Sequence, residues 1–477
     1  MGNKTIFSNF IWKFMERVAA QVISFAVSVI LARILMPEEY GIIAIVNVFI
    51  AFADVFIASG ISNSLIQKDE VDELDFSTIL VLNIGISFLL YIFLYFTAPI
   101  ISGFYEQPSL ILILRILGIR IILSGYKAVQ QAYLVRNMLF KQGSIISLIS
   151  NLFSGAAGIL LALCGYGIWA LVFQQIALVL SEIILQIIFL KWFPKIMFSH
   201  ERVSNLFSYG NDIMLSSFLD TLNNQARVLM IGKFYRSSDV AYYNRGDAYP
   251  QLLINSINSS LNVVLFSTFS KEQNNLTIVK DLLRKSIKIG TYIVFGILTG
   301  LAIVAKPLIV LMLTAKWEEC VPYLQIACFS YATWVVQIPN NEVIKGLGFS
   351  KSFLKITIIR VIVGLSMLFL SIGRGVLFIS LITFVTNLLS TILVCDWSRR
   401  NINYSIEEQL KDIAPAMILS IVMACVLAVF PIFISNYAIL LFVQVVFGAA
   451  VYLAISNLFH LESFLWLKSK IRNVIRG

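Results

Sequence analysis

The sequence has little of the chemistry on which most enzymes depend. Only 13% of its residues are charged, and it contains two histidines and five cysteines. The cysteines form no CxxC pair and lie in or beside hydrophobic stretches, which is typical of small packing residues rather than of metal or disulfide sites. The patterns HExxH, GxSxG and the phosphate-binding P-loop are missing. We therefore predict that the chain is not an enzyme and that it holds no metal or organic cofactor.

A cleavable signal peptide is also lacking, because the first hydrophobic segment has no small-residue cleavage site and is expected to stay in place. What the sequence does have is apolar residues: 59% of its 477 residues are hydrophobic, and the mean hydropathy is +0.87. This composition excludes a soluble fold and predicts an all-α polytopic membrane protein. The net charge of +10 does not indicate nucleic acid, since the basic residues gather at the ends of hydrophobic segments.

Crossing a bilayer as a helix takes about 20 apolar residues, and the sequence contains about 14 such segments. They are predicted near 13–35, 41–66, 76–104, 109–134, 142–163, 167–190, 205–232, 240–268, 286–313, 321–345, 354–372, 375–395, 413–434 and 437–458. With the N-terminus inside, 24 of the 36 basic residues fall in cytoplasmic segments and six on the opposite side. The positive-inside rule thus predicts both termini in the cytoplasm.

The connecting loops are short, and the longest is the basic cytoplasmic connection at 268–286. No loop on the outer side has room for a catalytic domain. This observation disfavours a membrane polymerase or ligase, since those enzymes usually place their chemistry on a large external loop.

The second half of the sequence resembles the first. The stretch 30–41 (ILARILMPEEYG) aligns with 230–241 (MIGKFYRSSDVA), and 136–141 aligns with 345–350. Parallel repeats of this kind occur in transporters whose halves are related by an axis along the membrane normal. We therefore predict two pseudo-symmetric six-helix lobes, followed by two additional transmembrane helices and a cytoplasmic tail. The predicted boundaries are 1–200, 201–400 and 401–477.

Several predicted helices combine a hydrophobic face with a polar stripe, which a bilayer tolerates only where the stripe faces water, a ligand or another helix. The first stripe comprises Asp220, Asn223, Asn224 and Arg227. The second comprises Asp247, Gln251, Asn255, Asn258 and Asn262, and a shorter one contains Gln337 and Asn341. Amides suit sugar hydroxyls because they donate and accept hydrogen bonds, but they suit helix-to-helix contacts equally well.

Two runs carry a resemblance to a known family: Ala32-Arg33-Ile34-Leu35-Met36-Pro37-Glu38-Glu39-Tyr40-Gly41 and Gly165-Tyr166-Gly167-Ile168-Trp169-Ala170-Leu171-Val172. With the number and spacing of the spans, they resemble bacterial polysaccharide-export flippases of the Wzx type. These belong to the superfamily of multidrug, oligosaccharidyl-lipid and polysaccharide exporters, which also contains the MATE exporters and the lipid II flippases.

The resemblance implies two six-helix lobes that move an undecaprenyl-pyrophosphate-linked oligosaccharide from the inner to the outer leaflet of the bacterial cytoplasmic membrane by alternating access. The resemblance also implies that the ligand is this lipid-linked oligosaccharide and that the protein is surrounded by membrane lipids. The implied partners are a polysaccharide polymerase and other assembly proteins.

The fourth predicted span offers candidates for binding the pyrophosphate. Arg120, Lys127 and Gln131 lie on one stripe, and Arg115 lies nearer the outer surface. Arg227 and Arg360 are the corresponding cations of the second half. A pyrophosphate could neutralise these cations; alternatively they could pair with acids in other spans or extend to lipid headgroups.

The acids in the spans are few. Asp54, Glu182, Asp220 and Asp247 are candidates for coupling transport to H⁺ or Na⁺, because a buried carboxylate can take up and release a cation. The alternative is a structural ion pair, such as one between Asp220 and Arg227 on the same face. An ion-coupled multidrug antiporter is the second hypothesis for the whole chain, and a lipid II flippase the third. An exporter of organic cations should have an acid-rich cavity, whereas the stripes counted here hold more cations than acids.

Overall fold

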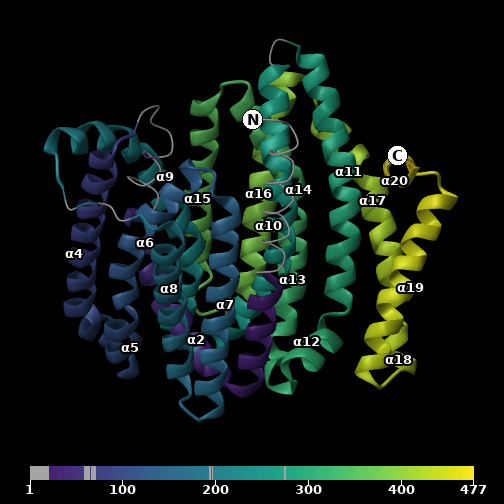
Figure 1. The fold of residues 1–477 in the computed structure, drawn as a ribbon. Helices are drawn as coiled ribbons and strands as arrows, with labels where there is room; N and C mark the ends of the chain where they lie inside the picture. Colours follow the sequence, from purple (N-terminus) through teal and green to yellow (C-terminus); the bar gives the residue numbers. More distant parts are fainter. Residues whose placement is uncertain are drawn as a thin grey trace. The chain divides into compact units, whose positions relative to one another are not determined.

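Apolar sequence of membrane-spanning length folds into helix throughout the part of the chain that the structure describes. This computed structural model describes residues 21–57, 65, 71–192, 195, 197–272 and 275–476, and every regular element in these ranges is helical (Figure 1). Ten helices in this part are long and apolar enough to cross a membrane. The predicted all-α polytopic membrane fold is confirmed.

The chain divides into two compact units, of which the first comprises Met1–Ala241. Its helices are Gln21–Ile34, α2 (Pro37–Asp54), α4 (Glu73–Tyr105), α5 (Ser109–Leu117), α6 (Ile119–Arg136), α7 (Phe140–Leu163), α8 (Ile168–Leu190) and α9 (His200–Phe234). Helix α6 packs between α4 and α8, and α8 also packs along α7. Helix α6 is therefore held by α4 on one side and by α8 on another.

The second unit comprises Tyr242–Gly477 and takes in most of α10 (Ser237–Lys271). Its further helices are α11 (Leu276–Ile303), α12 (Ala305–Leu313), the short 3₁₀ helix η2 (Ala315–Cys320), α13 (Val321–Ala332), α14 (Trp334–Gly346), α15 (Ser350–Leu370), α16 (Val376–Ile402), α17 (Ile406–Leu427), α18 (Phe430–Phe433), α19 (Tyr437–Leu458) and α20 (Glu462–Arg476). Helix α11 is central in this unit and packs against α13, α14 and α17.

Some helices differ from the predicted spans. The predicted basic loop at 268–286 is mostly helix, because α11 begins at Leu276, where the side chain of Asn275 caps the amide of Ile278 at 3.2 Å. Ion pairs from Lys280 and Arg284 to α17 then stabilise the polar end of the helix. The spans predicted at 109–134, 286–313 and 321–345 are each broken into two helices, near Gly118, Val304 and Thr333.

The internal similarity of the sequence recurs as backbone geometry. A helix ends at Ile34 and α2 begins at Pro37, and 200 residues later α9 ends at Phe234 and α10 begins at Ser237. In the first turn the carboxylate of Glu39 accepts a hydrogen bond from the amide of Met36 at 2.8 Å. In the second, Asp239 accepts from the amide of Arg236 at 3.0 Å. The same capping rule therefore builds both helix starts.

The two runs that carry the family resemblance lie against one another in the first unit. A Cβ atom at Gly167 would lie 2.5 Å from a carboxylate oxygen of Glu39, and one at Gly41 would lie 1.7 Å from the carbonyl oxygen of Ser237. Gly167 also has φ +55°, which L side chains rarely adopt. Glycine is thus required at both positions, one for close backbone approach and one for approach and conformation.

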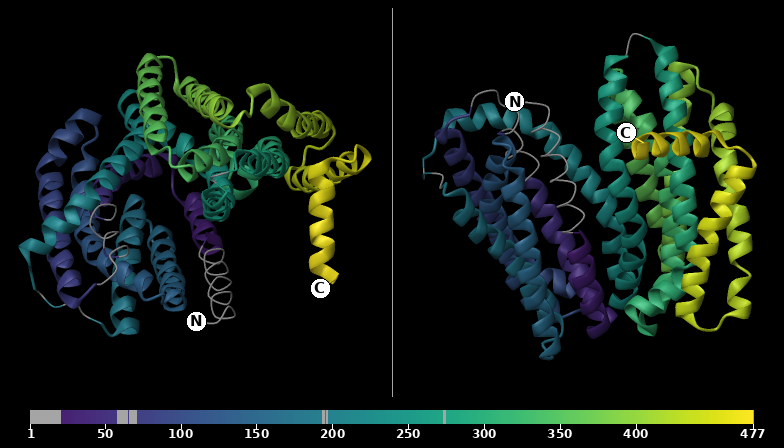
Figure 2. Two further views of the ribbon diagram at one scale, coloured as in Figure 1. Left: turned by 90° about the horizontal axis from the view of Figure 1, so that it is seen from above. Right: turned by 45° about the vertical axis from the view of Figure 1, so that its right-hand side comes forward.

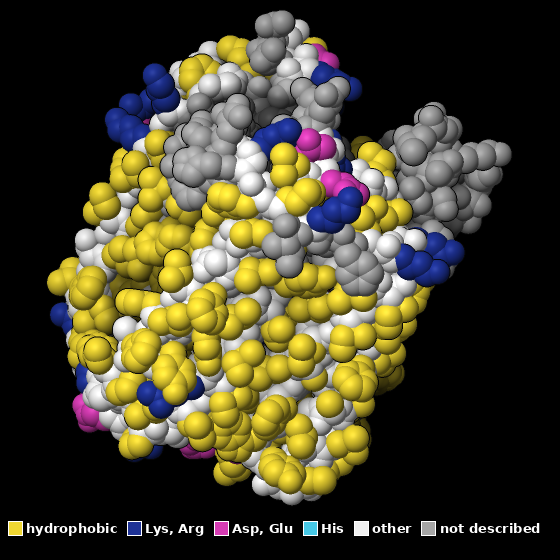
Figure 3. All heavy atoms as spheres, turned by 60° about the vertical axis from the view of Figure 1, so that its left-hand side comes forward, with side chains coloured by type: hydrophobic (Ala, Val, Ile, Leu, Met, Phe, Trp, Pro, Cys, Tyr) yellow, Lys and Arg dark blue, Asp and Glu magenta, His cyan; other side chains and the backbone are white. Residues whose placement is uncertain are grey.

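The outer surface is suited to lipid. In one space-filling view hydrophobic side chains cover most of the face, and most visible charged side chains lie towards its upper edge (Figure 3). On α4 the exposed residues include Leu89, Phe93, Phe96 and Ile100, each more than 60% exposed. Exposed aromatic and aliphatic side chains in such number are stable in hydrocarbon and not in water. The chain is a multi-pass membrane protein.

Candidate functional site

Two polar contacts and a shared cavity join α6 to α8 inside the first unit. On α6 the side chains involved are Arg120, Lys127 and Gln131, and on α8 they are Gln175, Glu182 and Gln186. Both sets are spaced i, i+7 and i+11, so each forms one stripe along its helix. The polar ladder, as we name these six residues, lies in two helices that are apolar enough to cross a membrane.

The first rung of the polar ladder holds Arg120. Its guanidinium donates to the amide oxygen of Gln175 on α8 at 2.8 Å and pairs with the carboxylate of Asp54 on α2 at 3.6 Å. The side chains of Arg120 and Asp54 are 27% and 35% exposed. One atom, Arg120 Nε, is buried without a hydrogen-bond partner among the described residues. The arginine is therefore charge-neutralised but keeps one donor for a further acceptor.

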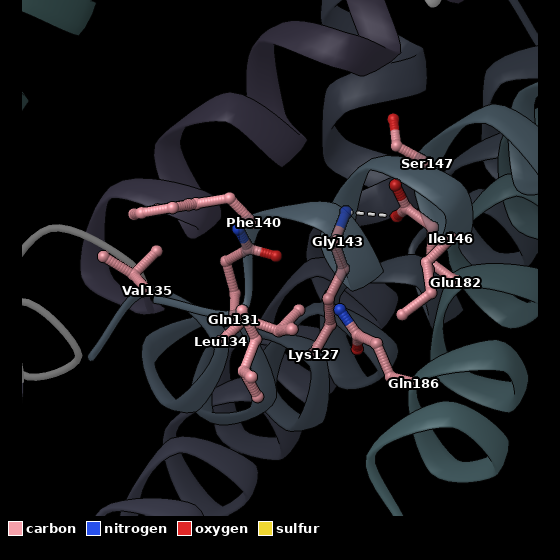
Figure 4. A pocket seen from close by; sticks show the side chains of 11 residues that line it. Lys127, Gln131, Leu134, Val135, Phe140, Gly143, Ile146, Ser147, Glu182 and Gln186 are labelled. Atoms are coloured by element: carbon pink, nitrogen blue, oxygen red, sulfur yellow. Dashed lines mark ion pairs between the residues drawn. The ribbon is translucent and has the colours of Figure 1, made fainter. Parts of the chain in front are cut away.

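The second rung is the ion pair between Lys127 Nζ and a carboxylate oxygen of Glu182 (Figure 4). The glutamate side chain is 15% exposed and the lysine 31%. A charge in a membrane span is costly unless paired or in contact with water. Pairing makes Lys127 and Glu182 neutral overall, and the pair also borders a cavity, so the cost of placing these charges in a span is reduced in both ways.

The third rung lies in that cavity, which has a volume of about 350 Å³ and is bounded by α6, α7 and α8. Gln131, Ser147 and Gln186 line it together with the ion pair (Figure 4). The Oε1 atom of Gln186 is buried without a hydrogen-bond partner among the described residues, and the whole residue is 2% exposed. The cavity thus offers an unfilled acceptor next to a carboxylate, and its volume is within the range of small-molecule sites.

Close packing fixes the helices that carry the polar ladder. Gly125 of α6 faces Ser87 of α4, where a Cβ atom would lie 2.3 Å from the serine hydroxyl oxygen. A Cβ atom at Gly158 of α7 would lie 3.0 Å from the side chain of Gln174 of α8. At the end of α6, Tyr133 stacks on Trp192 with ring centroids 4.1 Å apart. Small residues let the helix backbones approach, which is how helices associate in lipid.

The other predicted cations lie on other helices. Arg115 on α5 lies over the ring of Tyr95, 4.2 Å from its centroid, and its Nε donates to the carbonyl of that residue at 3.4 Å. Arg227 is half-buried on α9, on the helix that also carries Asp220, Asn223 and Asn224. Arg360 is half-buried on α15. The structure therefore brings together Arg120, Lys127 and Gln131, with Asp54 and Glu182.

The stripe predicted on α10 is described only in part. Asp247 accepts a hydrogen bond from the hydroxyl of Tyr331 on α13 at 2.9 Å. Gln251 and Asn255 are exposed, and the side chains of Asn258 and Asn262 lie outside the described residues.

On α14, Gln337 is almost fully buried and its amide nitrogen donates to Thr391 at 2.9 Å and to the carbonyl of Asn387 at 2.8 Å. Gln337 thus joins α14 to α16, which is the helix-to-helix role. Asn341, on the same helix, is half-buried.

Three residues of α8 matter more than the sequence indicated. Gln175 and Gln186 were not among the predicted site residues, and Glu182 was considered only for ion coupling. The signal that identifies them is the spacing i, i+7 and i+11 within an apolar helix, which repeats the spacing of the stripe on α6. No group of three or more His, Cys, Asp or Glu side chains that could hold a metal ion occurs among the described residues. The site offers hydrogen bonds and exchangeable charges.

Comparisons with known proteins agree on one family. A family model described as "Polysaccharide biosynthesis protein" matches residues 30–322. The chain is 25% identical over 347 residues to the teichuronic acid biosynthesis protein TuaB of Bacillus subtilis, covering 72% of each. It is 24% identical over 327 residues to the succinoglycan biosynthesis transport protein ExoT of Rhizobium meliloti, covering 69% of this chain and 66% of that one. A third relative is the lipopolysaccharide biosynthesis protein WzxC of Escherichia coli, 23% identical over 63% of this chain and 61% of its own length.

Two solved structures share the fold. The lipid II flippase MurJ in an inward closed conformation superposes with a TM-score of 0.75 at 15% identity, covering 95% of this chain and 99% of that one. An inward-facing MATE multidrug transporter gives a TM-score of 0.62 at 15% identity, covering 80% and 94% of the two chains. At these identities the likeness concerns the fold alone.

Proposed function

The chain belongs to the polysaccharide biosynthesis protein family, and we propose that it is the flippase for an undecaprenyl-pyrophosphate-linked oligosaccharide. It moves this repeat unit from the inner to the outer leaflet of the bacterial cytoplasmic membrane by alternating access, with both termini in the cytoplasm. On the outer side the cargo passes to a polysaccharide polymerase and other assembly proteins. Support comes from the relatives, whose names refer to the biosynthesis or transport of three different bacterial polysaccharides.

The observation that carries the proposal is the polar ladder between α6 and α8. A pyrophosphate with about two negative charges must cross a hydrocarbon layer of about 30 Å, and even one charged side chain at a helix centre costs about 2.5–3.5 kcal/mol. A pathway through the protein must therefore provide cations and hydrogen bonds at that depth. Arg120 and Lys127 supply cations within apolar helices, and each already has an acid within reach.

The acid partners give the proposed transport a means of coupling. While Asp54 and Glu182 are ionised, they neutralise the two cations of α6. A proton on either carboxyl group weakens its ion pair and leaves the cation able to bind a phosphate oxygen instead. Release of the proton then restores the ion pair and displaces the phosphate. Exchange of partners on Lys127 and Arg120 would link cargo binding to H⁺; a Na⁺ ion at the carboxylates would act in the same sense.

The cavity beside the polar ladder suits the sugar part of the cargo. Its unfilled acceptor is the Oε1 atom of Gln186, and Glu182 accepts as well. A sugar hydroxyl donates to both kinds of oxygen, whereas a phosphate dianion only accepts. We therefore assign the cavity to sugar hydroxyls and the two cations to the pyrophosphate.

The test is delivery of lipid-linked oligosaccharide to the outer leaflet in cells that lack their own surface-polysaccharide flippase. The intact chain is compared with Arg120→Ala, Lys127→Ala, Arg227→Ala and Gln186→Leu at matched membrane levels. Lys411→Gln is the matched control, because this lysine pairs with Glu407 on its own helix and both side chains are more than 70% exposed.

We expect the intact chain and the control to restore surface polysaccharide and the Arg120 and Lys127 variants to lose it. If the intact chain restores no tested glycan but raises resistance to cationic dyes, the flippase proposal fails and an ion-coupled multidrug antiporter replaces it.

A further inference from the structure

Helix α20 has a direction and a composition unlike those of the other helices of the second unit. It follows α19 after a turn in which His460 has φ +49°, and it runs across the direction of α17 and α19 instead of continuing along them (Figure 2). The spans predicted from sequence end at 458, so this helix was not anticipated.

The first turns of α20 are anchored to the rest of the unit. The carboxylate of Glu462 pairs with Lys288 of α11 at 2.8 Å, and the hydroxyl of Ser463 donates to the carbonyl of the same lysine at 3.1 Å. Phe464 and Leu467 pack against the hydrophobic cluster formed by α11, α17 and α19. These contacts hold the base of the helix at the end of the bundle that the positive-inside rule places in the cytoplasm.

Beyond its base, α20 has a basic composition and extends away from the other helices. Its main packing partners among the described helices are α11 and α19, and in Figure 2 its far end projects away from the bundle of the second unit. Leu465 and Trp466 are 40% and 46% exposed. The segment 462–476 has four basic residues, Lys468, Lys470, Arg472 and Arg476, against the single acid Glu462, and that acid is already paired.

The apolar residues of α20 follow helical spacing. Phe464 and Leu467 face the hydrophobic cluster, and Ile471, Val474 and Ile475 continue the spacing in the sequence at i+7, i+10 and i+11 from Phe464. A helix with one apolar face and flanking Lys and Arg is typical of segments that lie in the interface of a bilayer. At 15 residues and with this many charges, α20 cannot cross the membrane.

We propose that α20 lies in the headgroup layer of the inner leaflet and binds anionic phospholipid there. The bilayer covers the apolar positions that follow Leu467 on this face, and the basic residues contact the phosphates of the lipid surface. Charge complementarity selects this occupant, since an inner leaflet rich in acidic lipid attracts clusters of Lys and Arg at a membrane boundary.

The experiment measures amide hydrogen exchange of 462–476 in the full chain, reconstituted in nanodiscs of phosphatidylcholine alone or with about a third of phosphatidylglycerol. The variant replaces Lys470, Arg472 and Arg476 by Gln. The matched control replaces Lys351 and Lys355, two exposed basic residues of α15, by Gln. We expect acidic lipid to slow exchange in α20 by roughly tenfold or more, in the intact chain and the control. High salt or the variant should abolish the slowing.

Equal exchange rates in the two kinds of nanodisc would overturn the proposal, because the protein alone would then hold the helix. Slowing that persists in the variant or at high salt would also overturn it. The comparison of the intact chain at low and high salt decides the matter even if the variant fails to assemble. A loss of lipid dependence leaves the proposed flippase function untouched, since none of these residues belongs to the polar ladder.

Discussion

The ion pair between Lys127 and Glu182 permits a quantitative test of the polar ladder. Replacing Glu182 by Gln leaves the ammonium of Lys127 without its counter-charge in an apolar bundle, and replacing Lys127 by Met leaves the carboxylate without its cation. Breaking a fully buried pair costs about 3–5 kcal/mol. These side chains are 31% and 15% exposed and border a cavity, so water screens part of that cost. We expect each single substitution to cost about 1–3 kcal/mol.

The double variant K127M/E182Q distinguishes the ion pair from two independent residues. The double variant has no unpaired charge, because both charged groups are removed. Replacing a buried ion pair by uncharged groups often changes the free energy of unfolding little. The double variant should therefore be more stable than either single variant, with a coupling energy of about 1–3 kcal/mol. For a unit of 241 residues, a loss of about 2 kcal/mol lowers Tm by roughly 4–8 °C.

The assay is thermal unfolding of the detergent-purified chain, with all four proteins heated at one scan rate because membrane proteins of this size commonly unfold irreversibly. Lys411→Gln serves again as the control and should leave Tm within about a degree, as surface ion pairs contribute little. The reasoning is refuted if the two single losses add up in the double variant. Additive losses would mean that Lys127 and Glu182 do not interact and that the second rung has no counter-charge role.

Three further predictions concern other contacts. Gly41→Ala should lower Tm by several degrees, because its Cβ would lie 1.7 Å from the carbonyl of Ser237, whereas Gly85→Ala, with no atom within 4 Å, should not; equal Tm values would contradict the close approach. Asp412→Asn should loosen α17 from α11, since Asp412 accepts two hydrogen bonds from Arg284 at 2.5 and 3.0 Å; faster hydrogen exchange in 406–415 would report this, and unchanged exchange would count against it. The hydrogen bond from Lys288 lowers the pKa of Glu462. The ion pair that anchors α20 is therefore fully formed above the ordinary pKa of a glutamate and is lost as the pH falls below about 4. Cleavage of α20 by pepsin should increase as the pH falls, and this increase should be smaller in Glu462→Gln.

The sequence was sufficient to predict the membrane fold, because uninterrupted apolar runs have few alternatives. The run at 142–163, for example, became α7 at Phe140–Leu163. Element ends were less certain where helices leave the apolar layer: α11 continues through Lys280 and Arg284 because α17 supplies their partners. Helix α20 was missed since it is too short and too charged for a rule based on span length.

The sequence predicted which residues share a helix face but not which side chains of other helices contact them. Periodicity predicted Arg120, Lys127 and Gln131 on one stripe; in the structure Lys127 and Gln131 line the cavity, and Arg120 contacts Gln175 and Asp54. It could not say that Asp54 and Glu182 neutralise two of them, because the choice of neighbouring helix is a tertiary property. The role of Gln337 could not be decided from the sequence either. A side-chain amide uses the same donor and acceptor atoms to hydrogen-bond a neighbouring helix or a sugar.

The unequal spacing of the polar ladder fixes the register of α6 against α8. Apolar helices in lipid can slide along each other with little change in contact, since one aliphatic turn resembles the next. The ladder has gaps of seven and four residues on both helices, and α6 and α8 run in the same direction with partners 55 residues apart. If α6 slipped by four, seven or eleven residues in either direction, only one of its three ladder residues would lie opposite a ladder residue of α8. The other polar side chains would then face apolar surroundings. Sliding of α6 past α8 is thus opposed at every step, and we expect these two helices to keep their alignment when the protein changes conformation.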